Sequence, residues 1–132
     1  MAAIRILLES SAKAFFKALY DEEVTDSFQS VVNRVINLRD CHEKNPDYIK
    51  YISTKGPDFI AGFKEISDTY VLLLSKDVKT SINTTIKEVE LDMFVHNPDI
   101  IATDVTVYRA MQIFSPVLNY IFDVLIFVNS SK

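Results

Sequence analysis

Few residues in this chain belong to the types that perform catalysis, and none stands in a known catalytic spacing. The 132 residues include two histidines, one cysteine and no tryptophan. Cys41 and His42 are adjacent, but neighbours on a helix point about 100° apart, so we do not expect a nucleophile–base pair or a shared metal from them. We expect a buried thiol beside a histidine at the end of an apolar stripe.

One acidic segment carries three residues of metal-ligand type at helical spacing. Glu88, Asp92 and His96 would share one face of a helix. A di-metal site in a bundle needs matching carboxylates and Glu-x-x-His pairs on other helices, and the sequence contains no such pair. Motifs for phosphate loops, serine hydrolases and zinc sites are also absent. We therefore predict no metal, no cofactor and no catalytic residue, and a protein that is not an enzyme.

Composition also restricts the compartment and the partners. The net charge of −4 and the pI of about 5.1 argue against duplex nucleic acid as the main partner. A single cysteine cannot form an intramolecular disulfide, which favours a reducing, cytoplasmic location. The first 20 residues, with Arg5, Lys13 and Lys17, also resemble an amphipathic import peptide, so mitochondrial import is the alternative. Attachment of this segment to a membrane surface is a weaker alternative, and no uncharged apolar stretch is long enough for a transmembrane segment.

Hydrophobic periodicity predicts the elements that must position these residues. Apolar residues recur every three or four positions, and two glycines and four prolines leave little material for tight turns. We predict an all-α single domain over residues 1–132, a compact bundle of about six or seven helices. Asn45-Pro46, Gly56-Pro57 and Asn97-Pro98 each indicate a helix start. The expected helices cover 3–20, 27–43, 46–54, 57–75, 78–95, 105–114 and, after a restart at Ser115-Pro116, 117–128.

One of these predicted helices has an alternative. Apolar and polar residues within 78–95 also alternate as in a strand, so the alternative fold is α+β with a small hairpin around 86–95 and 104–109.

Gly62 lies inside a predicted helix, where it costs about 1 kcal/mol relative to alanine. Its missing side chain indicates a close approach by another helix.

The closing helix is apolar on nearly every side, so it must be enclosed by other helices or by another subunit. We place it at the centre of the bundle or at an interface, and its candidate interface residues are Val117, Tyr120, Ile121, Val124, Leu125 and Val128. The first functional interpretation is a protein–protein interaction or assembly module that self-associates. In size and helical class it resembles small adaptors of viral or phage origin. The alternative is a helical-bundle enzyme or ligand carrier with an internal aromatic pocket, and a cavity reached by Tyr or His would favour it.

Overall fold

The computed structural model describes residues 2–94 and 104–131, and over these residues the chain forms seven helices and no strand. The helices are α1 (Ala2–Tyr20), α2 (Phe28–Ile36), α3 (Leu38–Lys44), α4 (Pro46–Ser53), α5 (Pro57–Leu73), α6 (Lys76–Phe94) and α7 (Asp104–Ser130). The all-α prediction is confirmed. The third expected start, Asn97-Pro98, lies outside the described residues.

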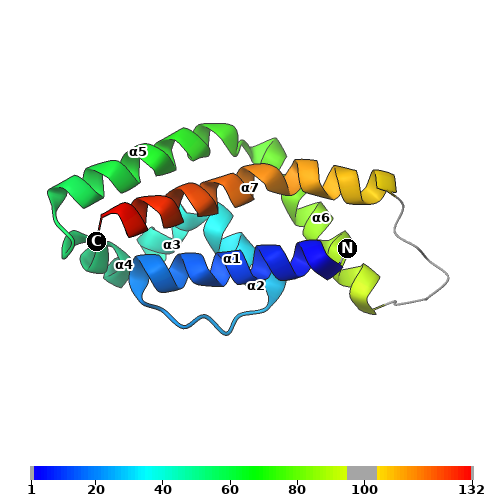
Figure 1. Cartoon of the computed structure of the whole chain (residues 1–132), viewed down its shortest axis with the longest axis horizontal. Coiled ribbons are helices and arrows are strands. Elements are labelled where there is room, and N and C mark those ends of the chain that lie inside the picture. Colours follow the sequence, from blue (N-terminus) through cyan, green and yellow to red (C-terminus); the bar gives the residue numbers. More distant parts are fainter. Residues whose placement is uncertain (1, 95–103, 132) are drawn as a thin grey trace.

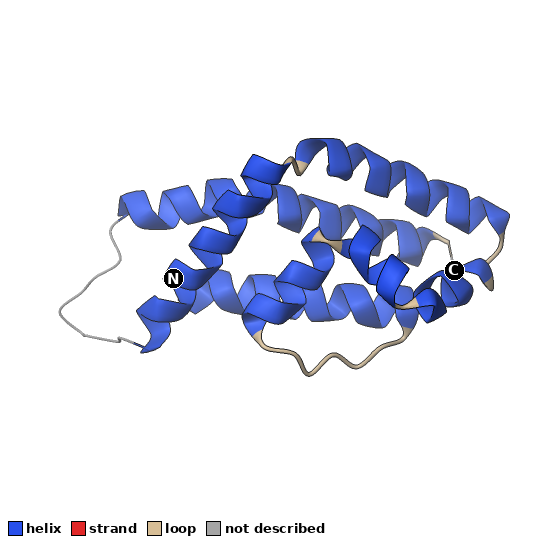
Figure 2. Cartoon of the chain, turned by 180° about the vertical axis from the view of Figure 1, so that it is seen from behind, coloured by secondary structure: helices blue, strands red, loops and turns tan. Residues whose placement is uncertain are grey.

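The helices form two layers (Figure 1). α5, α7 and α1 lie side by side, with α7 in the middle, parallel to α1 and antiparallel to α5. Seen from behind, α2, α3, α4 and α6 cover this layer (Figure 2). α7 packs against α1, α5 and α6, while α1 also contacts α2, α4 and α6. The closing helix is therefore central to the bundle.

Local chemistry explains where the first helices begin and end. α1 stops at Tyr20 because Asp21 takes the left-handed conformation (φ 54°), where its carboxylate pairs with Lys17 at 2.9 Å. Ser27 is the N-cap of α2, and its side chain accepts a hydrogen bond from the Ser30 N–H. The Asp26 carboxylate accepts hydrogen bonds from Ser30 Oγ and from Arg34 of the same helix.

The expected single helix over 27–43 is wrong, because the structure divides it at Asn37. Asn37 is the C-cap of α2 and precedes α3, and its side-chain amide donates to the Asn33 carbonyl at 3.1 Å. An asparagine side chain that bonds the backbone competes with the helical ladder, which permits the bend. Pro46 and Pro57 begin α4 and α5 as predicted.

Residues 76–94 are helical, so the hairpin alternative over 86–95 and 104–109 is wrong in the part that the structure describes. The threonines fit a helix because their hydroxyls bond carbonyls one turn back: Thr80 to Lys76, and Thr85 to Ser81. Gly62 has the predicted role. A Cβ at this position would lie 2.6 Å from the Phe127 ring, so glycine permits α7 to approach α5.

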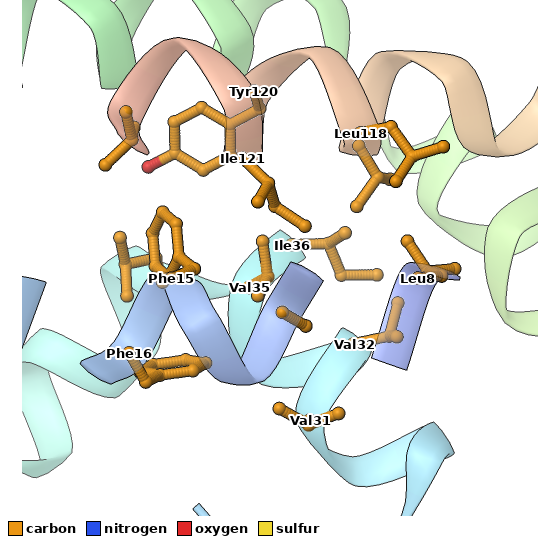
Figure 3. Close-up of a cluster of buried hydrophobic side chains, with 14 of the residues drawn as sticks. Leu8, Phe15, Phe16, Val31, Val32, Val35, Ile36, Leu118, Tyr120 and Ile121 are labelled. Atoms are coloured by element: carbon orange, nitrogen blue, oxygen red, sulfur yellow. The ribbon is translucent and has the colours of Figure 1, made fainter. Parts of the chain in front are cut away.

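The expected break at Ser115-Pro116 is also wrong, because α7 continues through Pro116 as one helix. A proline inside a helix removes one backbone hydrogen bond and costs about 3 kcal/mol. Residues on both sides of Pro116 are buried in the same core: Phe114 before it, and Val117, Leu118 and Ile121 after it. This burial keeps the helix continuous across the proline. In Figure 3, Leu118, Tyr120 and Ile121 lie opposite residues of α1 and α2, among them Leu8 and Phe15.

Five of the six candidate interface residues are buried in the core of the single chain: Val117, Tyr120, Ile121, Val124 and Val128. Leu125 is half-buried and packs against the same core. These side chains are therefore enclosed by the chain's own helices. The exposed side of α7 is mixed, since the polar Asn119 and Asp123 lie there together with the apolar Phe122 and Ile126.

The segment Tyr108–Ser130 of α7 is long and apolar enough to cross a membrane by length and composition, with a mean hydropathy of 1.7. This segment is longer than the apolar helix predicted over 117–128, because α7 continues through Pro116 as one helix. A central helix of a bundle meets the same criterion, and α7 packs on three helices. The length and hydropathy of this segment are therefore compatible both with a membrane-spanning helix and with the central helix of a bundle.

Candidate functional site

A cleft of about 480 Å³ runs along α5, and we call it the α5 cleft. α5 forms one wall, the α2–α4 segment forms the other, and Tyr120 of α7 contributes to the floor. Lys79 lines it from α6. In Figure 2, α5 lies above α3 and α4, with α7 behind them.

The walls of the α5 cleft are mainly apolar. On α5 the lining residues include Ile60, Phe63, Ser67, Val71 and Leu74, which recur every three or four positions. Ile60 and Leu74 are 14 positions apart, which is about 21 Å at 1.5 Å per residue. Along this second face of α5, beside the one that packs on α7, Phe63 and Leu74 are buried, while Ile60 and Val71 remain exposed.

The opposite wall comes from the end of α2 and from α3 and α4. Ile36, Leu38 and Ile52 are buried core residues that border the cleft, while Ile49 remains exposed on its rim. The bend at Asn37 turns α3 away from the axis of α2, and Asn37 itself lines the cleft. The part of this wall that α2 and α3 form was predicted as one helix over 27–43, and the structure divides it at Asn37.

Tyrosine hydroxyls supply the polar part of the floor. The hydroxyl of Tyr120 lies 3.0 Å from Ser67 Oγ, and the hydroxyl of Tyr70 donates to Asp123 Oδ2 at 2.5 Å. Burial raises the pKa of Tyr120 to about 12. Burial and the bond to Asp123 raise the pKa of Tyr70 to about 12. Both phenols are therefore neutral near pH 7, where they can hydrogen-bond a ligand without acting as bases.

His42 reaches the α5 cleft from α3 but is already engaged. Its Nε2 lies 2.5 Å from the hydroxyl of Tyr20, and its ring contacts Phe63. Burial lowers the pKa of His42, so the ring is neutral at pH 7. The neighbouring Cys41 thiol lies 3.6 Å from the Arg34 carbonyl, and burial raises its pKa, so it remains protonated. The two adjacent residues thus do not form a nucleophile–base pair.

A cluster of charged and aromatic side chains surrounds Arg34 of α2. The guanidinium bonds Glu22 at 2.9 and 3.1 Å and Asp26 at 3.2 Å, and it also donates to the Tyr48 hydroxyl. It lies 4.4 Å from the centre of the Phe16 ring. Burial works against this charge, but the bonds to Glu22 and Asp26 offset it and raise the pKa of Arg34.

Tyr48 connects this cluster to His42. Its hydroxyl donates to Glu22 at 2.6 Å, and its ring stacks on Tyr20 at 4.3 Å. Burial, with the bond to Glu22, raises the pKa of Tyr48 to about 12. This cluster was not predicted from the sequence, because its members come from α1, the following loop, α2 and α4. Its only signal was an acidic run at residues 21–26 before an arginine on the next helix.

The other sequence candidates are the metal-ligand set over 88–96 and the membrane-facing side of α1. The side chains of Glu88 and Asp92, and all of His96, lie outside the part that the structure describes in detail. Within the described residues no three His, Cys, Asp or Glu side chains converge as metal ligands. The apolar face of α1 that membrane attachment would use, including Phe15, Phe16 and Leu19, is buried in the core.

Comparison with known proteins adds no assignment: no family model, no curated protein and no solved structure matches this chain. The functional interpretation therefore rests on the geometry of the cleft.

Proposed function

We propose that this chain is a ligand-binding protein without catalytic activity, and that the ligand lies in the α5 cleft. The observation that supports this most is a cleft of about 480 Å³ with apolar walls and three tyrosine or histidine side chains along it. Small-molecule sites typically measure about 300–1,000 Å³. At about 30 Å³ per molecule the cleft holds roughly 16 waters, and a ligand would release them from apolar walls.

The length of the cleft favours an elongated ligand. The α5 side of the cleft extends about 21 Å, and side chains that are mainly apolar line it. An extended hydrocarbon chain is compatible with such a cleft.

The polar groups along the α5 cleft support binding and not chemistry. His42 is engaged by Tyr20, and the Tyr120 hydroxyl by Ser67. The raised pKa of Tyr120 and the lowered pKa of His42 both favour neutral forms. Neutral, hydrogen-bonded groups in an apolar site orient a ligand, whereas a general base needs a free acceptor.

The test is uptake of the neutral, apolar dye Nile red, whose emission rises in apolar surroundings. Val71→Trp would fill the cleft with an indole, and we expect it to reduce dye binding at least fivefold. Leu73→Trp is the matched control, because Leu73 lies on the same helix, is similarly exposed (55% against 47%) and does not line the cleft. Both variants change an exposed residue, so both should fold. Equal binding by both variants, or no binding by the unchanged protein, would refute the proposal.

A second candidate function is self-association, which one further observation favours. Phe122 and Ile126 are 40% and 63% exposed and lie one turn apart on α7, so they form an apolar strip on the outer face of the central helix. Light scattering during size-exclusion chromatography tests this directly. We expect Ile126→Glu to convert a dimer to a monomer if this strip is the contact. A monomeric unchanged protein at high concentration would exclude this candidate.

A further inference from the structure

The charges around the α5 cleft do not balance. Its charged lining residues are Arg39, Asp40, Lys64, Asp68 and Lys79, three bases and two acids, or 3 − 2 = +1. The chain as a whole carries −4. The cleft is therefore a locally positive region on an acidic protein, and a ligand with one negative charge would complement it.

Lys79 is the least exposed of these five charges. Lys79 is half-buried, whereas the other four are exposed to solvent. None of the described ion pairs includes any of the five. A partly buried ammonium group without an anion gains more from an anionic ligand than a fully hydrated one does.

Lys79 also lies at one end of the cleft. It is in the first turn of α6, which starts where α5 ends, near Leu74. α4 lies at the other end of α5 (Figure 1), so Ile49, Ile52 and Ile60 line the far end of the cleft. The half-buried Lys79 thus lies at one end of the cleft and the three isoleucines at the other, roughly 20 Å apart along α5, with the exposed Lys64 one turn from Ile60.

We propose that the ligand of the α5 cleft is a free long-chain fatty acid, with its carboxylate at Lys79 and its hydrocarbon chain extended toward Ile52 and Ile60. This rests on the proposed binding function and specifies its ligand class. One acyl chain spans about half of a 30 Å bilayer core, or roughly 15 Å, so one chain and its head group match the length of the cleft. The single surplus charge matches one carboxylate.

The experiment is displacement of Nile red by hexadecanoate and by hexadecanol, both below the concentration at which they aggregate. In the unchanged protein we expect hexadecanoate to bind about tenfold more tightly than the uncharged alcohol. Lys79→Met should remove this advantage and leave hexadecanol unaffected. Lys64→Met is the matched control, because that lysine lines the same cleft but is exposed and near Asp68. It should change hexadecanoate binding less than about twofold.

The outcomes separate the two proposals. If both compounds displace the dye equally, or if Lys79→Met and Lys64→Met behave alike, the carboxylate assignment is wrong while the cleft remains a binding site. If neither compound displaces the dye and Val71→Trp has no effect on its binding, the binding function itself is wrong. A preference for an acidic amphipathic peptide over hexadecanoate would overturn the ligand class and indicate a protein partner.

Discussion

Gly62 offers a direct measurement of how closely α5 and α7 pack. An alanine Cβ at this position would lie 2.6 Å from both Cε2 and Cζ of Phe127, whereas carbon atoms pack optimally about 3.5–4.0 Å apart. The ring would have to move by about 1 Å, against its contact with Phe59, whose ring centre is 5.1 Å away. Gly62→Ala is therefore an overpacking substitution at the centre of a helix pair.

Two effects of opposite sign determine the result. Alanine improves helix propensity by about 1 kcal/mol relative to glycine. Overpacking costs roughly 1–3 kcal/mol. We expect Gly62→Ala to lower the free energy of unfolding by between about 0 and 2 kcal/mol. Leucine at position 127 lacks the Cε2 and Cζ atoms that lie too close, and the Cδ2 position of Phe127 is an ordinary 3.7 Å from the alanine Cβ. In a Phe127→Leu background Gly62→Ala should therefore raise the free energy of unfolding by about 1 kcal/mol.

The assay is urea denaturation of the four proteins in this double-mutant cycle, followed by circular dichroism. The expected coupling between Gly62 and Phe127 is roughly 1–3 kcal/mol. Thr69→Ala serves as a control, because Thr69 is exposed on the same helix and should not couple with Phe127. If Gly62→Ala stabilises both backgrounds equally, by about 1 kcal/mol, the helices do not approach as described and the reasoning fails.

Three further experiments test the Arg34 cluster, the half-buried His42 and the central helix. Arg34→Met should lower the free energy of unfolding by roughly 2–3 kcal/mol, because it leaves carboxylates of the cluster without a partner; a loss below 0.5 kcal/mol would show that the cluster is merely superficial. Burial lowers the pKa of His42, so the unfolded chain binds protons more readily below about pH 6.5, and stability should fall on acidification. His42→Gln should reduce this slope in denaturation measured from pH 7.5 to 5.5, and an unchanged slope would contradict the assignment. Ile121→Asp with Leu125→Asp should abolish cooperative thermal unfolding, whereas Ile126→Asp should leave it intact; equal melting temperatures would place α7 outside the core.

Local sequence patterns predicted most of the helices, because the causes of those helices are local. The proline starts at Pro46 and Pro57 depend on residues within one turn, and they are confirmed. The close approach at Gly62 was inferred from a glycine that a helix does not otherwise favour. The same local logic failed at Pro116, where burial on both sides of the proline outweighs the lost hydrogen bond.

The α5 cleft could not be predicted from the sequence. Its lining residues come from six helices, α2 to α7, and no periodicity indicates which helix faces remain uncovered. The break at Asn37, which lies in the lining of the cleft, was likewise not indicated by the periodicity of residues 27–43. The Arg34 cluster joins residues that are 8 to 14 positions apart along the chain.

The amino-acid sequence by itself determined the all-α class, most helix starts and the apolar character of the closing helix. Only the tertiary structure decided that the candidate interface residues of that helix are enclosed by α1, α5 and α6, and that a face of α5 stays open beside Lys79. The physical reason is one of range. Helix formation depends on backbone hydrogen bonds and side chains within about four residues, whereas burial depends on which surfaces meet after the whole chain has folded.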